Sequence, residues 1–167
     1  VNLAKITGTP AIDPADGSII VGCDNDSVYC AAGRRSGTYT KWTYDAGAPV
    51  YSPVSILGTS LDNSGKAFFT SEDGFLHAVY LSSGNFAWKK QIVQDPVFFS
   101  SAVTISGDKA YVATQDFLCC LDAHTGEEMY RRYASHGPLS GFANGPTVHN
   151  GIAYIYDGEY LLAVNQS

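Results

Sequence analysis

The sequence is poor in charge, and above all in positive charge. Charged side chains make up 16% of the 167 residues, and 16 acidic residues outnumber 10 basic ones, which gives a formal net charge of −6. Nucleic acids and anionic membrane surfaces are bound by basic surfaces, so this composition argues against both kinds of partner. No apolar run approaches the roughly 20 residues that a membrane-spanning helix needs.

Sequence motifs of common enzyme classes are also missing. The chain has no P-loop, GxGxxG or GxSxG nucleophile elbow, and its Ser, His and Asp residues have no spacing that joins them into a triad. The histidines form no HExxH or His-x-His pair, and the four cysteines lack the CxxC spacing of a zinc site. We therefore predict no catalytic residue, no metal ligand and no bound cofactor.

The four cysteines are poorly placed for disulfides. Cys119 and Cys120 are adjacent within an expected strand, where successive side chains point to opposite faces. Cys23 and Cys30 flank a hairpin turn, and the diagonal between them is long for a disulfide. We expect packed thiols at these positions, with a disulfide as the alternative for each pair.

The chain does contain a repeat. Similar segments open four units, and the steps between their corresponding residues are 43, 48 and 45 residues long. These residues are Pro10, Pro53, Ser101 and Pro146. A fixed period of this size is typical of repeat architectures.

The second unit shows the plan of one repeat most clearly. Four β-rich segments, separated by turns that contain Asp, Asn, Ser and Gly, cover residues 52–57, 66–71, 75–80 and 86–90. The other units follow the same plan, and the fourth stops after a third strand at 160–164. Four strands in each repeat of 40 to 50 residues predict an all-β fold of β-propeller blades. We place the blades at about 7–50, 51–97, 98–142 and 143–167, within one propeller domain or propeller segment.

The ends of the repeats carry a more specific pattern. Residues 121–126 (LDAHTG) are followed four positions after the Gly by Tyr130, and Gly84 and Trp88 have the same spacing. Gly37 and Trp42 are one residue further apart. These units resemble the blades of the pyrroloquinoline-quinone (PQQ)-like repeat superfamily. The resemblance implies a ring of seven or eight blades and a docking role between blades for Trp42, Trp88 and Tyr130.

The two ends of the sequence are complementary. Residues 1–6 look like a fourth strand, and the last unit lacks one. Three interpretations stay open: a closed four-bladed ring in which residues 3–6 pair with 160–164, a part of a ring of seven or eight blades, and two chains that share one eight-bladed ring. We favour the second of these.

The resemblance permits more than one function. Quinoprotein alcohol dehydrogenases of similar blade pattern bind PQQ and calcium through a Glu, an Asn and an Asp and carry an adjacent-cysteine disulfide, but no motif maps these ligands onto this chain. We therefore favour a non-catalytic interaction or structural propeller that presents loop rims to a protein, a glycan or copies of itself. The alternatives are a fragment of a PQQ-dependent dehydrogenase and a sensor or docking propeller of a multidomain enzyme. Phe142, in the long loop at 136–144, is the expected contact residue.

Two sequons bear on location. Asn25 and Asn165 each begin an Asn-x-Ser sequence and are candidate glycosylation sites in a secreted protein. Residues 24–27 (DNDS) could also offer oxygens to calcium, but they lack the Gly and the distal Glu of an EF-hand loop, so we interpret them as a turn. Together with the habit of the family, the sequons favour an extracellular or extracytoplasmic location.

Overall fold

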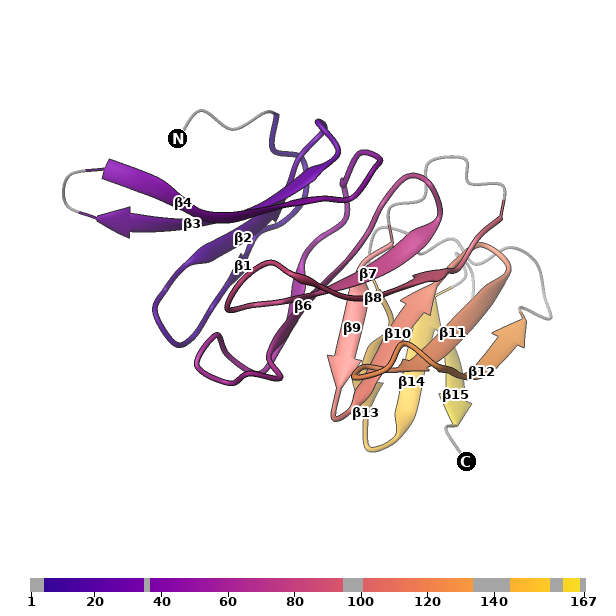
Figure 1. Ribbon diagram of the computed structural model, residues 1–167. Helices are drawn as coiled ribbons and strands as arrows, with labels where there is room; N and C mark the ends of the chain where they lie inside the picture. The colour runs from indigo at the N-terminus through magenta and orange to yellow at the C-terminus, as the bar shows by residue number, and fades with distance from the viewer. Residues whose placement is uncertain (1–4, 35–36, 95–100, 134–144, 157–160, 166–167) are drawn as a thin grey trace. The chain divides into compact units, whose positions relative to one another are not determined.

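The computed structural model is built from strands (Figure 1). It describes residues 5–34, 37–94, 101–133, 145–156 and 161–165. Within these ranges there is no helix, and hence none long and apolar enough to cross a membrane. The strands form four antiparallel sheets, one for each predicted repeat, and this confirms the all-β prediction.

The chain divides into two compact units, and the first, residues 1–100, contains two four-stranded blades. The strands of the first blade are β1 (Ala11–Ile12), β2 (Ile19–Gly22), β3 (Ser27–Arg34) and β4 (Gly37–Asp45). Those of the second blade are β5 (Ser55–Leu57), β6 (Lys66–Thr70), β7 (Phe75–Tyr80) and β8 (Phe86–Gln91). In both blades the order in space follows the order in the chain, so each blade is a meander of hairpins.

The second unit, residues 101–167, holds the other two sheets. The third blade contains β9 (Val103–Ser106), β10 (Lys109–Ala113), β11 (Phe117–Asp122) and β12 (Glu128–Tyr133). The three described strands of the fourth blade are β13 (Thr147–His149), β14 (Ile152–Tyr156) and β15 (Leu161–Asn165). The prediction of four-stranded antiparallel blades is thus confirmed for three repeats, and the last sheet has the three strands expected from the sequence.

Each four-stranded blade has a β-bulge at the same place in its outer strand. In the second blade Ala78 pairs with Trp88, and the next residue of β7, Val79, pairs with Phe86, so Ala87 is an extra residue. The register shifts in the same way in the first and third blades, where the extra residues are Lys41 and Met129. A bulge bends its strand and re-aims the next side chain. That next residue is one of the three predicted docking aromatics, Trp42, Trp88 and Tyr130.

The core of the first unit lies between its two blades. One face of the first blade packs against one face of the second in a cluster that includes Ile20, Val28, Trp42, Phe69 and Val79. Along β6 and β7, every second side chain faces this core, and the side chains between them face the opposite side of the second blade, as strand geometry requires. Burial of apolar area between sheets is therefore what holds the two blades together.

Trp42 contacts the second blade at one turn. Its indole Nε1 donates a hydrogen bond to the Leu81 carbonyl over 2.8 Å. Its ring lies against Gly84, whose φ is +71° and where a Cβ atom would come within 2.7 Å of the ring. Glycine is therefore required at this turn by both its backbone conformation and the close approach of the indole.

The second unit has its own core between the third and fourth blades. It includes Tyr111, Leu118 and Cys120 of the third blade and Ala153 and Ile155 of the fourth, with Tyr130 packed against it. Burial raises the pKa of Tyr130 to about 12, with the nearby Cys120 thiol as the next cause. Burial also raises the pKa of the Tyr111 phenol and of the Cys120 thiol. Tyr111, Tyr130 and Cys120 therefore remain protonated at neutral pH.

All four cysteines are free and buried, as their strand positions predicted. Cys119 lies opposite Arg131 and Cys120 opposite Tyr130, so the two adjacent thiols occupy opposite faces of the third blade. Burial raises the pKa of the Cys119 thiol to about 12, which makes it an unreactive thiol.

The described N-terminal residues run along the first blade. Ile6 forms an isolated antiparallel bridge with Cys23, and the Asp24 amide donates to the Lys5 carbonyl over 3.2 Å. The pairing of residues 3–6 with 160–164 involves positions outside the described residues, so that interpretation stays a prediction, as does the number of blades in the ring.

Candidate functional site

In two blades, one in each unit, a hydrogen-bonded turn between the second and third strands ends at a phenylalanine. The Ser71 amide donates to the Phe75 carbonyl over 3.0 Å, and the Thr114 amide donates to the Phe117 carbonyl over 2.8 Å. In the second of these turns the Thr114 hydroxyl oxygen also accepts from the amides of Asp116 and Phe117. Each turn therefore fixes a phenylalanine at the first position of the third strand.

A cation from the outer strand lies over each of these rings. Lys89 Nζ is 4.7 Å from the centroid of Phe75, and Arg131 Cζ is 4.0 Å from the centroid of Phe117. In both blades the cation follows its phenylalanine by 14 residues in the sequence. A cation over an aromatic ring at an exposed site contributes about 0.5–1 kcal/mol. The contact thus recurs with the repeat and orders the end of the outer strand.

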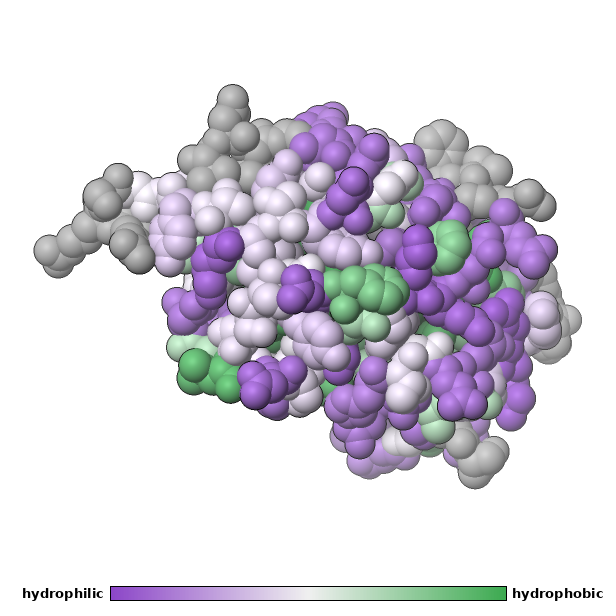
Figure 2. All heavy atoms as spheres, in the orientation of Figure 1, coloured by the Kyte–Doolittle hydropathy of each residue, from purple (hydrophilic) through white to green (hydrophobic). Residues whose placement is uncertain are grey.

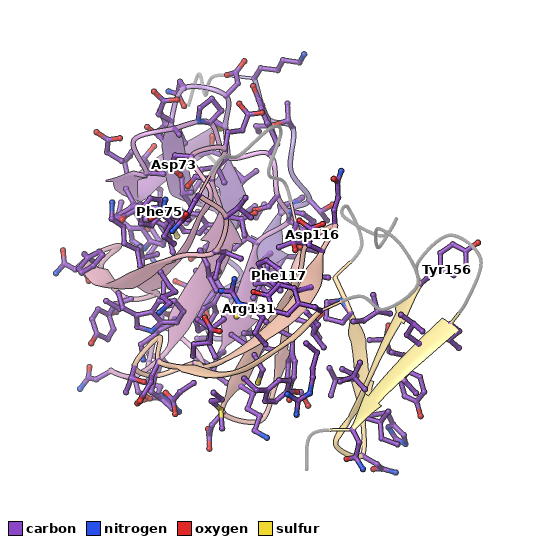
Figure 3. All side chains as sticks on the ribbon, turned by 90° about the vertical axis from the view of Figure 1, so that its right-hand side faces the viewer. Asp73, Phe75, Asp116, Phe117, Arg131 and Tyr156 are labelled. Carbon is purple, nitrogen blue, oxygen red and sulfur yellow. The ribbon has the colours of Figure 1, made fainter. Side chains whose placement is uncertain are left out.

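The third blade adds two groups to this contact. Glu128 accepts two hydrogen bonds from Arg131, from Nε over 3.1 Å and from Nη2 over 2.9 Å. Tyr133 meets the edge of Phe117 with ring centroids 5.6 Å apart, and the residue is 70% exposed. Figure 3 shows Arg131 and Phe117 lying close together on this blade. We call these four residues, Phe117, Glu128, Arg131 and Tyr133, the aromatic–guanidinium cluster.

The second blade has a buried hydrogen-bond chain beside its turn. Ser71 Oγ donates to Asp73 Oδ1, so the same oxygen must accept from His77 Nε2, 2.9 Å away. The neutral ring then presents the lone pair of Nδ1 to the Tyr44 hydroxyl, 3.1 Å away. The tautomer with the proton on Nε2 therefore completes a chain from Tyr44 of the first blade to Asp73.

Burial controls the charge of His77. The side chain is fully buried and stacks on Phe69 with ring centroids 5.3 Å apart and an interplanar angle of 8°. This desolvation lowers the pKa of His77 to about 4, although the Asp73 carboxylate acts in the opposite direction. Ser71 is also fully buried, so the pair cannot reach a substrate. The Ser–His–Asp group in this blade is a structural network. It was not predicted, because its link to the first blade joins His77 to Tyr44, which is 33 residues away in the sequence.

Carboxylates gather near the turns of the first unit. Burial raises the pKa of Tyr44, and the charges of Asp45 and Asp73 add to this effect. The pKa of Tyr51 is also raised, by desolvation first and then by Glu72, Asp24 and Asp26. These tyrosines therefore stand in negative potential, in keeping with the net negative charge of the chain.

The structure separates most of the residues that the sequence singled out. Trp88 is buried next to Phe68, with ring centroids 5.8 Å apart, and a docking role for it stays a prediction. Asn25 lies exposed in a turn, where its Nδ2 donates to the Tyr29 hydroxyl over 2.7 Å, and Asn165 ends β15. Glycosylation at both stays a prediction. Phe142 lies outside the described residues.

The aromatic–guanidinium cluster was not expected from the sequence. The signal that could have revealed it is the recurrence of phenylalanine and, 14 residues later, a cation in the second and third repeats. Among the described residues, no group of three or more His, Cys, Asp and Glu side chains could hold a metal ion. The alternative of PQQ and calcium therefore stays an untested expectation.

Solved structures identify the fold. BamB from Moraxella catarrhalis superposes with a TM-score of 0.74 and 16% identity, over 98% of this chain and 50% of that one. A quinohemoprotein alcohol dehydrogenase from Comamonas testosteroni superposes with a TM-score of 0.60 and 20% identity, over 78% of this chain and 21% of that one. The chain has the fold of the PQQ-like β-propeller repeat proteins. The expectation from the repeat pattern is thus confirmed for the fold.

The matching structures differ in how much of their own length this chain covers. The chain spans about half the length of the BamB structure. A computationally designed protein, Ika4, superposes with a TM-score of 0.71 and 12% identity, over all of this chain and 94% of that one. No protein-family model matches the sequence, and no curated protein has a similar sequence. At these identities the likeness concerns the fold, and function must be argued from the residues.

Proposed function

We propose that this PQQ-like propeller is a non-catalytic protein-interaction module that binds a protein partner through the aromatic–guanidinium cluster of the third blade. The observation that carries the proposal is the exposure of Tyr133 beside a guanidinium that is already fixed. Tyrosine and arginine are the side chains most enriched among the energetically dominant residues of protein interfaces. Arg131 loses little further freedom on binding because Glu128 and the Phe117 ring hold it.

The strand that carries the cluster supports a protein as the partner. β12 is an edge strand of its sheet, and its residue Met129 is 52% exposed in addition to Tyr133. An edge strand with large apolar side chains offers both backbone hydrogen bonds and side-chain contacts to an extended segment of another protein. Figure 2 shows, on the face turned to the viewer, hydrophobic residues in separate patches within a largely polar surface. Small, separate apolar patches are usual on protein surfaces, so the proposal rests on the residues of β12 and not on these patches.

We also propose that the protein lies in an extracytoplasmic compartment and that it catalyses no reaction. The two sequons and the family resemblance favour an extracytoplasmic compartment, where a glycan at Asn25 or Asn165 would be compatible with an interaction role. The runner-up function, a PQQ-dependent dehydrogenase fragment, has only the similarity in fold to support it.

The test compares two exposed tyrosines on outer strands. The wild-type protein, a Tyr133→Ala variant and a Tyr39→Ala variant are immobilised and used to capture proteins from an extracellular or periplasmic extract. Tyr39 is 41% exposed on β4 and is the matched control. We expect a protein that the wild type and Tyr39→Ala retain and Tyr133→Ala loses. Equal capture by all three, or the absorbance of a bound quinone in the purified protein, contradicts the proposal.

A further inference from the structure

A row of three polar side chains crosses the third blade. Tyr111 of β10 pairs with Cys120 of β11, and Cys120 pairs with Tyr130 of β12. Directly paired residues of neighbouring strands point to the same face of a sheet, so the thiol lies between the two phenols. Tyr111 and Cys120 belong to the core that the third and fourth blades share, and Tyr130 packs against that core. The row is therefore enclosed in the interface between these two blades.

The corresponding rows of the first unit contain no hydroxyl group. They are Ile20, Cys30 and Trp42 in the first blade and Phe68, Ala78 and Trp88 in the second. In the first blade the polar group of the outer residue is paired directly, because the Trp42 indole donates to the Leu81 carbonyl. The geometry of a blade thus does not require polar groups at these positions, and the two phenols of the third blade need an explanation of their own.

The two hydroxyl groups are buried without a protein partner. The phenol oxygens of Tyr111 and Tyr130 are both inaccessible to solvent, and neither has a hydrogen-bond partner among the described residues. The raised pKa of Tyr111 comes from burial first and then from the Cys120 thiol and the Tyr130 phenol, so the three polar groups lie near one another. Buried polar groups in native proteins are nearly always paired, either with protein or with ordered water.

The surroundings restrict what these groups can bind. The other side chains of this core are all apolar, and they include Leu118, Ala153 and Ile155. The phenols and the thiol are protonated at neutral pH, so they offer a neutral site that does not suit a metal ion. A water molecule matches them, because it can accept a hydrogen bond from each phenol and donate one to the sulfur. About three such bonds are typical of a buried water.

We propose that Tyr111, Cys120 and Tyr130 form a binding site for one buried water molecule between the third and fourth blades. A single water pairs both hydroxyl groups and fixes the direction of the two rings, against which the fourth blade packs. The site does not depend on the protein partner proposed for the aromatic–guanidinium cluster.

A crystal structure of the wild-type protein tests the site directly. We expect a density peak within about 3.2 Å of the phenol oxygens of both Tyr111 and Tyr130. The absence of that peak, or a structure in which the two phenols bond each other or another protein group directly, overturns the proposal.

Removal of the hydroxyl groups tests whether one water serves both. The variants are Tyr111→Phe, Tyr130→Phe and the double variant, and the rings stay in place, so the fold should be retained. Tyr133→Phe is the matched control, because it removes a phenol from the same strand at a residue that is 70% exposed. The equilibrium constant for folding is measured by denaturant unfolding.

Each single substitution should lower that constant about fivefold, as expected for one typical hydrogen bond, and Tyr133→Phe should leave it unchanged. The double variant should be no less stable than either single variant, because the first substitution already deprives the remaining hydroxyl of its water. Single variants as stable as the wild type would mean that the phenols have no partner, and a double variant that loses the product of the two single effects would mean separate partners. Either result overturns the proposal.

Discussion

His77 should make the stability of the first unit depend on pH. The pKa of the buried imidazole is lowered from an ordinary value of 6.5 to about 4. Between these two values the unfolded chain binds a proton that the folded chain does not bind. Stability from this residue is therefore complete above about pH 6.5 and is lost as the pH falls towards 4.

The magnitude follows from the size of the shift. A difference of one pKa unit between the folded and the unfolded state corresponds to about 1.4 kcal/mol. The shift of His77 therefore amounts to a loss of about 3 kcal/mol of unfolding free energy when the pH has fallen to about 4. The groups that face the ring are Asp73, Tyr44 and Lys89, and of these only the Asp73 carboxylate favours protonation. That carboxylate is linked to the ring through the Ser71 hydroxyl, and it does not reverse the effect of burial.

The assay is urea unfolding of the wild type and of His77→Gln at several pH values between 7.5 and 4.5. The glutamine amide can still donate to Ser71 and accept from Tyr44, but it does not titrate in this range. The difference in unfolding free energy between the two proteins removes the contributions of the other titratable groups, which both proteins share. We expect the wild type to lose its advantage as the pH falls. His124→Gln, at an exposed position, is the control for histidine removal in general. A wild type and a His77→Gln variant with parallel pH profiles would refute the reasoning.

Three further predictions concern contacts between and within blades. Gly84→Ala should destabilise the protein by about 3 kcal/mol in thermal unfolding, because a Cβ at positive φ is strained and also collides with the Trp42 ring. Gly151 also has a positive φ but has open space around it, so Gly151→Ala should cost only about 1 kcal/mol in the same assay. Trp42→Phe keeps an aromatic ring but loses the indole N–H bond to the next blade, so it should cost about 1–2 kcal/mol in denaturant unfolding, and a change within error would contradict the contact. Arg131→Lys should cost about 0.5–1 kcal/mol and should reduce the further loss caused by Glu128→Gln, because lysine cannot form the two-bond pair. Strictly additive losses in a double-mutant cycle would argue against that pair.

The strands could be predicted because their signals are local. In the second blade the expected segments 66–71, 75–80 and 86–90 correspond to β6, β7 and β8 to within one residue. Turn residues and β-rich runs are read over a few neighbouring positions, and the repeat adds three further copies of the pattern.

The first strand of that blade was predicted too long, for a specific reason. β5 begins at Ser55, although 52–57 was expected. Ser52 is held by its side chain: Oγ donates to the Thr70 carbonyl over 3.1 Å and accepts from the Thr70 amide over 2.9 Å. A hydroxyl that substitutes for the backbone ladder leaves no trace in the strand propensity of the sequence.

The candidate site depends on contacts that the sequence does not encode locally. The ring of Phe117 meets Arg131 only because β11 and β12 pair in one register, and that register contains a bulge. The network of His77 needs Tyr44 from another blade. Neither the bulge nor the packing of the two blades is visible in a pattern of apolar and polar residues, so both sites remained hidden until the strands were paired.

The repeated bulge sets a condition on how blades can be exchanged or recombined. Removing one residue from the outer strand, for example Ala87, would leave a regular ladder with Trp88 still opposite Ala78, but it would remove the bend and the extra twist that set the direction of the following aromatic. The blade itself would remain well paired, and the damage would fall on its neighbour. Whether an insertion or deletion at this position is tolerated therefore depends on how the blade packs against the adjoining repeat. Grafting a blade from another propeller should succeed only when the donor has its extra residue at the same step of the outer strand.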